Sequence, residues 1–520
     1  MVEKGPVPRK TTGGVSNVEI EEEASIVASN SIYSFLRSAS KFVLSFLVSV
    51  FFVRFLGPVN YGVYSIVIIY WGVFLSIVSL GFGSTVRYAI AKYRAKSDGR
   101  RIRWVAEHYL LLTVAASLAG GAVMFSIAGP LASAYHSPVI KPLIEILALG
   151  LVFYSISENF ASNAYVGLQK MKYAFWTGML FDALRVGQFV LLFYGFGLIG
   201  IISFYDVIYA VSATVGVFLI FKTLRRAKPK KIISTDRDEL GKYSAFSWTS
   251  GLITMVYGPV ISLFLGLVAP NVAYVGYYRV GLLMSGVVGM PAAALGSAFF
   301  STITKYYERK EHENFHKMSG VLIRYATLVT VPLVFGGIVA ANQIVKYIYR
   351  AAFLGAEAPL VILLVSVLIG SVFSPVMLTL SAIGKQKYFF YSSIFGAVTG
   401  IILTAAIVPT LLAEGAALVY LGVNLVMITT SILFASRYVK IKIPMTAMAK
   451  ILICGGIMSG VLYLVLRSVT RLSLLPLVLI GGLVLYAVLT YLFNAINNRD
   501  IVFILRMTKT EKFVRKLLNR

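Results

Sequence analysis

The sequence predicts an all-α membrane protein that crosses the bilayer many times. Of its 520 residues, 58% are apolar, and the mean hydropathy is +0.82. A soluble core does not need so much apolar surface, so most of the chain is expected to lie in lipid. Apolar runs recur along the chain at the length of about 20 residues that a helix needs to cross a bilayer. We therefore expect about 14 transmembrane helices.

The first half of the chain contains six of these expected spans, and the second half contains eight. In the first half the apolar runs cover 31–53, 61–83, 105–128, 142–164, 174–195 and 199–221. In the second half they cover 243–267, 274–299, 319–341, 358–381, 388–409, 414–436, 446–467 and 474–495. Four spans contain a proline that we expect to kink or break the helix, namely Pro259, Pro291, Pro332 and Pro375.

The spans divide the chain into six segments. They are a disordered cytoplasmic tail (1–24), an N-lobe (25–221), a basic cytoplasmic linker (222–242), a C-lobe (243–436), two further helices (437–497) and a basic amphipathic tail (498–520). The last segment alternates apolar and basic residues, which predicts a tail lying on the anionic inner leaflet. A solvated tail is the alternative.

Lysine and arginine predict the orientation of the chain in the membrane. They cluster in the connections after the second, sixth and eighth spans, whereas the alternate connections hold few of them. Because basic loops stay in the cytoplasm, both termini are expected there, in a multi-pass protein of the plasma membrane.

Other classes of function fit the sequence poorly. The formal net charge of +27 lies in short loops rather than on one soluble face, which argues against nucleic acid as a partner. The lone cysteine, Cys454, rules out a disulfide framework and a cysteine metal site. Asp236 and Asp238 form a D-x-D pair of the kind that holds a metal–nucleotide, but a solvated loop is the favoured interpretation. We expect a transporter without metal or cofactor rather than an enzyme.

The two halves of the chain contain similar segments. The run 57–64, Gly-Pro-Val-Asn-Tyr-Gly-Val-Tyr, follows the first span, and the similar run 269–278 follows the seventh. Six spans separate the two copies, so they share one orientation, as in transporters built from two parallel halves.

The first span carries two cations, Arg37 and Lys41, on one helical face. A cation at mid-membrane costs about 2.5–3.5 kcal/mol on insertion scales, so such residues usually face a bundle interior or a water-filled cavity. Snorkelling toward the interface is the alternative for Arg37. Arg279 and Arg324 lack an acidic partner at helical spacing, which makes these four cations candidates for binding an anion such as phosphate.

Acidic residues in the spans are candidates for ion or proton coupling. Asp182 and Arg185 are three residues apart and can pair with each other, so a purely structural pair is the alternative for them. Glu158 and Asp206 lie in the fourth and sixth spans.

One segment resembles a known family. Arg54, Gly57, Pro58, Tyr61 and Gly62, with Leu56, are similar to the R-x-L-G-P-x-x-Y-G segment of the multidrug/oligosaccharidyl-lipid/polysaccharide (MOP) exporter superfamily, in particular its polysaccharide-type (Wzx-like) flippases. The resemblance implies two pseudo-symmetric six-helix lobes around a central cavity, alternating access, and two extra C-terminal helices that make a groove for an isoprenoid tail. It also places Arg37, Lys41 and Arg279 in regions where lipid-flipping relatives carry cavity cations.

The expected function is translocation of a lipid-linked oligosaccharide, on a polyprenyl or dolichyl phosphate or pyrophosphate, from the cytoplasmic to the outer leaflet. Cavity arginines and lysines would hold the anionic head group. The expected partners are this substrate, membrane lipids and glycan-assembly enzymes, with the protein itself a monomer. Two alternatives stay open: a cation-coupled antiporter of organic cations on the same fold, and a non-transporting scaffold for glycan assembly.

Overall fold

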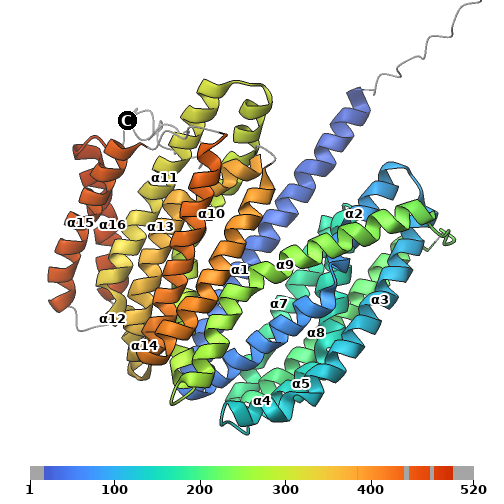
Figure 1. The fold of residues 1–520 in the computed structure, drawn as a ribbon, viewed down its shortest axis with the longest axis horizontal. Helices are drawn as coiled ribbons and strands as arrows, with labels where there is room; N and C mark the ends of the chain where they lie inside the picture. Colours follow the sequence, from blue (N-terminus) through green and yellow to red (C-terminus); the bar gives the residue numbers. More distant parts are fainter. Residues whose placement is uncertain (1–16, 226, 383–384, 439–443, 469–473, 496–520) are drawn as a thin grey trace, which may run out of the picture.

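The structure is a computed structural model that describes residues 17–225, 227–382, 385–438, 444–468 and 474–495 (Figure 1). Side chains are described from residue 44 onward, except at 45, 250, 253–257, 298, 301, 312, 374, 379, 381–382 and 386. Within these ranges the chain forms helices and short connections, and no strand occurs. The predicted all-α membrane fold is confirmed.

The helices of the first half form one lobe. They are α1 (Asn17–Ser79), α2 (Phe82–Ala95), α3 (Gly99–Ser126), α4 (Ala128–Ala134), α5 (Ile140–Tyr154), the π-helix η1 (Ser155–Ala161), α6 (Ser162–Gly167), α7 (Met171–Phe193) and α8 (Gly197–Thr223). Two helices of this lobe, α1 and α5–η1–α6, are continuous in the chain but irregular inside.

The second half forms the other lobe and two added helices. The lobe contains α9 (Ser234–Val268), α10 (Ala273–Glu308), α11 (His312–Val339), α12 (Ala341–Ile344), η2 (Val345–Tyr349), η3 (Ala351–Ala356), α13 (Glu357–Ala382) and α14 (Gln386–Ser436). The added helices are α15 (Met445–Ser468) and α16 (Leu475–Leu492), and they pack on each other and on α11.

Eleven helices in the described ranges are long and apolar enough to cross a membrane. Two of them contain a break, at Gly57 in α1 and at Leu412 in α14. In α9 the described stretch Gly258–Val268 is apolar as well, but it is shorter than a full span. This count takes each broken helix as one, so the protein is a multi-pass membrane protein and the number fourteen stays a prediction.

Three boundaries differ from the sequence prediction. The helix α1 begins at Asn17, within the predicted tail, and the residues before it lie outside the described ranges. The helix α2 continues to Ala95, beyond the predicted end at residue 83, after a break where Leu80 and Gly81 have φ of 43° and 73°. The helix α9 begins at Ser234, inside the predicted linker. These extensions are amphipathic rather than apolar, so a search for apolar runs does not find them.

The bundle has two faces, which we name by the termini. The start of α1 and the end of α16 lie at one face, the terminal face, and α4 and α12 lie at the opposite face (Figure 1). The largest core cluster contains residues of both lobes, among them Val67 and Ile202 of the first and Val280 and Leu363 of the second. The lobes are therefore packed against each other in this structure.

Candidate functional site

The two lobes touch at the opposite face through the repeated segments. The second part of α1 crosses the start of α10 at Gly62 and Gly276. A Cβ atom on Gly62 would lie 2.1 Å from the carbonyl oxygen of Val272, and one on Gly276 would lie 2.6 Å from that of Pro58. Only glycine permits this approach of backbone to backbone. We name these four residues the glycine crossing.

The remaining residues of the family motif surround this crossing. Gly57 has φ of 71°, a conformation that glycine adopts without strain, and it breaks α1 in two. The buried Tyr61 packs edge-on against Phe353 of η3, with ring centroids 6.3 Å apart. Arg54 lies half-buried one turn before the break. The motif therefore shapes the contact between the lobes at the opposite face.

Two arginines, one from each lobe, lie near the hydroxyl of Tyr64. The positive charges of Arg185 of α7 and Arg279 of α10 both lie within electrostatic range of this hydroxyl, and that of Arg279 also lies within range of the Tyr61 hydroxyl. The guanidinium carbon of Arg185 lies 5.6 Å from the ring centroid of Tyr205. We name Arg185, Arg279, Tyr61, Tyr64 and Tyr205 the two-arginine cluster.

The guanidinium of Arg279 is not saturated by the protein. Its Nε atom is buried and has no hydrogen-bond partner within the described residues. Leaving a buried donor of a charged group unpaired is costly, and native proteins seldom do so without a ligand or water. An anion at this position would supply the missing acceptor, and arginine offers it two parallel donors.

Asp182 lies one turn before Arg185 on α7. The side chain is buried, with 5% of its surface exposed. Its carboxylate interacts electrostatically with Arg185, as the spacing of three residues allows. Arg185 is thus coupled both to Asp182 and to the tyrosines of the cluster.

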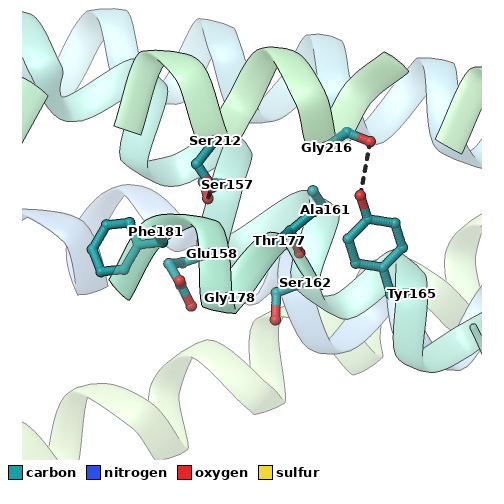
Figure 2. Close-up of a pocket in the computed structure, with 10 residues that line it drawn as sticks. All are labelled: Ser157, Glu158, Ala161, Ser162, Tyr165, Thr177, Gly178, Phe181, Ser212 and Gly216. Carbon is teal, nitrogen blue, oxygen red and sulfur yellow. Dashed lines mark hydrogen bonds between the residues drawn. The ribbon is translucent and has the colours of Figure 1, made fainter. Parts of the chain in front are cut away.

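Glu158 lies in a small pocket, and half of the residues that line it carry a hydroxyl group (Figure 2). Ser157, Ser162, Tyr165, Thr177 and Ser212 contribute the hydroxyls, from η1, α6, α7 and α8. The Ser157 and Ser212 hydroxyls are 2.8 Å apart, and the Tyr165 hydroxyl donates to the carbonyl of Gly216 at 3.2 Å. The π-helix η1 places Glu158 here, and π-helical turns are frequent at functional sites.

Asp206 of α8 packs directly on Gly150 of α5. A Cβ atom on Gly150 would lie 1.8 Å from the Oδ1 atom of Asp206, so the glycine leaves the space that this carboxylate fills. The Oδ1 atom is buried and has no hydrogen-bond partner within the described residues. Asp206 is therefore a third carboxylate inside the first lobe, apart from Asp182 and from the pocket of Glu158.

Arg324 lies away from the two-arginine cluster. Its Nη2 atom donates to the carbonyl oxygen of Ala495, after the end of α16, at 2.6 Å. The side chain also lines a cavity of about 400 Å³, together with His316 and Lys317 of α11 and Pro444. Arg324 therefore lies beside the added helices.

Arg37 and Lys41 lie on the first part of α1, but their side chains are outside the described residues. The sequence predicts Arg185 as part of a coupling site or as the structural partner of Asp182, and it does not single out Tyr64 as a site residue. The position of Tyr64 at the end of the repeated motif was the one available signal. Within the described ranges, no group of three His, Cys, Asp or Glu side chains is arranged to hold a metal ion.

The fold is that of the MOP-superfamily transporters. The structure of the "Lipid II flippase MurJ, inward closed conformation" matches with a TM-score of 0.71 and 16% identity, over 91% of this chain and 99% of that one. An inward-facing multidrug resistance MATE family transporter matches at 0.65 and 15%, over 78% and 97% of the two chains. A MOP superfamily transporter from Pyrococcus furiosus matches at 0.53 and 17%, over 79% and 95%.

The family follows from the sequence. The model of the family described as "Polysaccharide biosynthesis protein" matches residues 27–306, a little over half of the chain, and the chain belongs to that family. No curated protein sequence matches this chain. The resemblance inferred from the segment 54–62 is confirmed.

Proposed function

We propose that this protein is a flippase that moves a lipid-linked oligosaccharide across the membrane by alternating access. The family and the fold support a lipid-linked substrate. One observation carries the proposal: arginines from the two lobes act on the same tyrosine hydroxyl where the lobes meet. A phosphate or pyrophosphate head group held there would contact both lobes, so its arrival and release would be linked to their movement.

The proposal also gives a role to the other three candidate cations. Arg37 and Lys41 would extend the cationic lining along α1. Arg324 would meet the head group earlier, because it lies next to the added helices that would carry the isoprenoid tail. A few separated cations suit transport better than one tight cage, since the cargo must also be released.

The cargo would be taken from the cytoplasmic leaflet of the plasma membrane, with both termini in the cytoplasm. Energy would come from a cation that binds Glu158, Asp182 or Asp206, or from the membrane potential. The protein would work as a monomer that receives its substrate from glycan-assembly enzymes.

Transport of a labelled polyprenyl-pyrophosphate oligosaccharide in proteoliposomes tests the proposal. Arg279→Glu should lower the rate at least tenfold, because it places a like charge where the head group binds, whereas Arg279→Lys should retain part of it. Arg467→Glu, a charge reversal at the exposed end of α15, is the matched control and should transport normally. Normal transport by Arg279→Glu would show that Arg279 does not bind the anionic head group.

The antiporter alternative rests on the pocket of Glu158. Its carboxylate and hydroxyl oxygens suit a small cation or a proton, as a cation-coupled exporter requires. The same proteoliposomes, loaded with an organic-cation dye under a proton gradient, distinguish the two functions. Movement of the dye without movement of the lipid would favour the antiporter. Movement of neither, with correctly folded protein, would favour the scaffold.

A further inference from the structure

The helix α9 belongs to both lobes. It starts at the terminal face beside α2 and runs to the opposite face beside α14 (Figure 1). Leu240, in its first part, is fully buried in a core cluster of the first lobe that contains Ile90 and Ile102. Ile261 and Leu265, in its last part, are fully buried in the cluster that joins the two lobes. Any relative movement of the lobes at the terminal face must therefore strain or release α9.

Charged side chains that precede Leu240 on α9 join this helix to α2. The Nζ atom of Lys92 lies 3.1 Å from Asp236 Oδ1 and 2.7 Å from Glu239 Oε2. The hydroxyl of Tyr93 donates to Asp236 Oδ2 at 2.7 Å, and that of Tyr88 donates to Glu239 Oε1 at 2.8 Å. We name these five residues the charged latch.

A second set of contacts lies one to two turns further along α9. The hydroxyl of Ser244 donates to the carbonyl of Leu80 at 2.7 Å. The indole Nε1 of Trp248 is 3.1 Å from the carbonyl oxygens of Ser76 and Ile77. Ser76 and Ile77 lie in the last turn of α1, where carbonyls lack a following helical N–H, and Leu80 lies in the break between α1 and α2. The start of α9 therefore completes the hydrogen bonding of the broken helix.

The backbone hydrogen bonding of α9 is interrupted in its last third. Pro259 lies inside the helix and removes one backbone hydrogen bond, and Gly258 precedes it. A proline in a helix interior kinks or breaks it. The first part of α9 can thus change direction without disturbing Ile261 and Leu265 in the core.

The charges of the latch persist at neutral pH. The hydrogen bonds from Tyr93 and then Lys92 lower the pKa of Asp236. Those from Lys92 and then Tyr88 lower the pKa of Glu239. The bonds of Lys92 to Glu239 and Asp236 raise the pKa of its ammonium group. The side chains of Lys92 and Asp236 are 18% and 14% exposed, so water reaches the pair and it can reopen at low cost.

We propose that the charged latch is a gate: it holds the first part of α9 on the first lobe, as in this structure, and releases it when the lobes change their relative position at the terminal face. Sequence reasoning took Asp236 and Asp238 as a solvated pair, but Asp236 is bonded to α2. The proposal uses the two-lobe movement of the proposed function, but its test needs no substrate, so the two can fail separately.

Distances between nitroxide labels in the full-length protein test the gate. One pair, on Lys170→Cys and Lys242→Cys, joins the first lobe to the first part of α9. The other, on Lys170→Cys and Glu308→Cys, joins the first lobe to the end of α10. All three positions are exposed, and the native Cys454 is fully buried. Double electron–electron resonance in lipid nanodiscs then gives both distance distributions.

Lys92→Glu should raise the population of long distances in both pairs by about threefold to tenfold, because it replaces attraction by repulsion at a half-buried pair that water still reaches. Adding Asp236→Lys and Glu239→Lys to Lys92→Glu should restore the original distributions. Arg94→Glu changes the same charge on the same helix at an exposed position and is the matched control.

Two results would overturn the proposal. In the first, Lys92→Glu leaves both distributions unchanged. In the second, only the pair with Glu308 lengthens, which would mean that α9 stays on the first lobe and bends at Pro259 instead. If Lys92→Glu does not fold, the triple variant tests the proposal instead. Its distance distributions must then match those of the unsubstituted protein.

Discussion

At the face opposite the termini the lobes meet backbone against backbone, whereas at the terminal face charged side chains hold the first part of α9 on the first lobe, beside the buried Leu240. The glycine crossing brings Gly62 against the carbonyl of Val272 with no side chain between them. The charged latch uses the long side chain of Lys92 and two carboxylates that water reaches. The first contact is rigid and depends on shape, and the second is adjustable and depends on charge.

This difference indicates how each contact can open. Close packing is lost at once when backbones separate, because dispersion contacts weaken steeply with distance. An exposed ion pair contributes only about 0.2–1 kcal/mol and can exchange its partners for water. We therefore expect the terminal face to open at lower cost than the opposite face.

The largest effect should come from a methyl group in the glycine crossing. Gly62→Ala places a Cβ atom on a backbone carbonyl, which cannot turn aside as a side chain can. We expect a loss of about 1–3 kcal/mol in the free energy of unfolding and loss of the closed opposite face. Thermal unfolding in detergent measures the first effect, and label distances across that face measure the second.

Gly72→Ala is the matched control for this substitution. Gly72 lies in the same part of α1, and a Cβ atom there would meet nothing within 4 Å. Equal behaviour of the two variants would show that helix propensity, rather than the crossing, sets the outcome.

A smaller effect should follow from Tyr93→Phe in the charged latch. The ring stays in the core, where Tyr93 is fully buried, but the hydroxyl that donates to Asp236 is removed. We expect the population of long distances between labels at 170 and 242 to rise about twofold to threefold, less than with Lys92→Glu. Tyr243→Phe retains the stacking on Tyr88 and should change nothing.

The smallest effect should come from salt, and it should act on one face alone. Screening shortens from about 30 Å at 0.01 M salt to about 3 Å at 1 M, which weakens exposed pairs. Label distances at the terminal face should lengthen modestly at 1 M salt, and those at the opposite face should not change. An equal response of both faces would contradict the contrast between them.

In contrast to salt, pH should have little influence on the charged latch near neutrality. The pKa of Asp236 is lowered, so its contribution is lost only as the pH falls through a value below the ordinary one. The pKa of Lys92 is raised, so its contribution is lost only as the pH rises above the ordinary one. The neighbouring cation Lys96 also favours an ionised Asp236. Burial raises the pKa of the Tyr93 hydroxyl, which therefore keeps the proton that it donates to Asp236. Between about pH 5 and pH 9 the label distances should stay constant.

The sequence predicts the helices well because apolar length is a local property. The family motif is also local, and Gly57 and Gly62 could be recognised without a structure. The extension of α2 and the start of α9 were missed because they leave the apolar part of the bundle. There Leu240 is the buried residue among polar neighbours, and one apolar residue gives no periodic signal.

The candidate site was predicted in part. Arg279 and Asp182 stand out as charges inside apolar runs, and that signal is sufficient to select them. The approach of Arg185 and Arg279 to Tyr64 joins three distant helices, and no spacing along the chain encodes it. The D-x-D pair of Asp236 and Asp238 is the opposite case. Its sequence alone favours a solvated loop, whereas in the structure Asp236 contacts Lys92.

The π-helix η1 also sets the rotation of the helix that follows it. A π-helical turn accommodates about one residue more than an α-helical turn. Removing one residue from Ser155–Ala161 would turn the following helix by about 100°. Asn163, which accepts a hydrogen bond from Arg87 at 2.6 Å, would then face elsewhere. A relative with a one-residue gap here is therefore expected to lack the Glu158 pocket altogether.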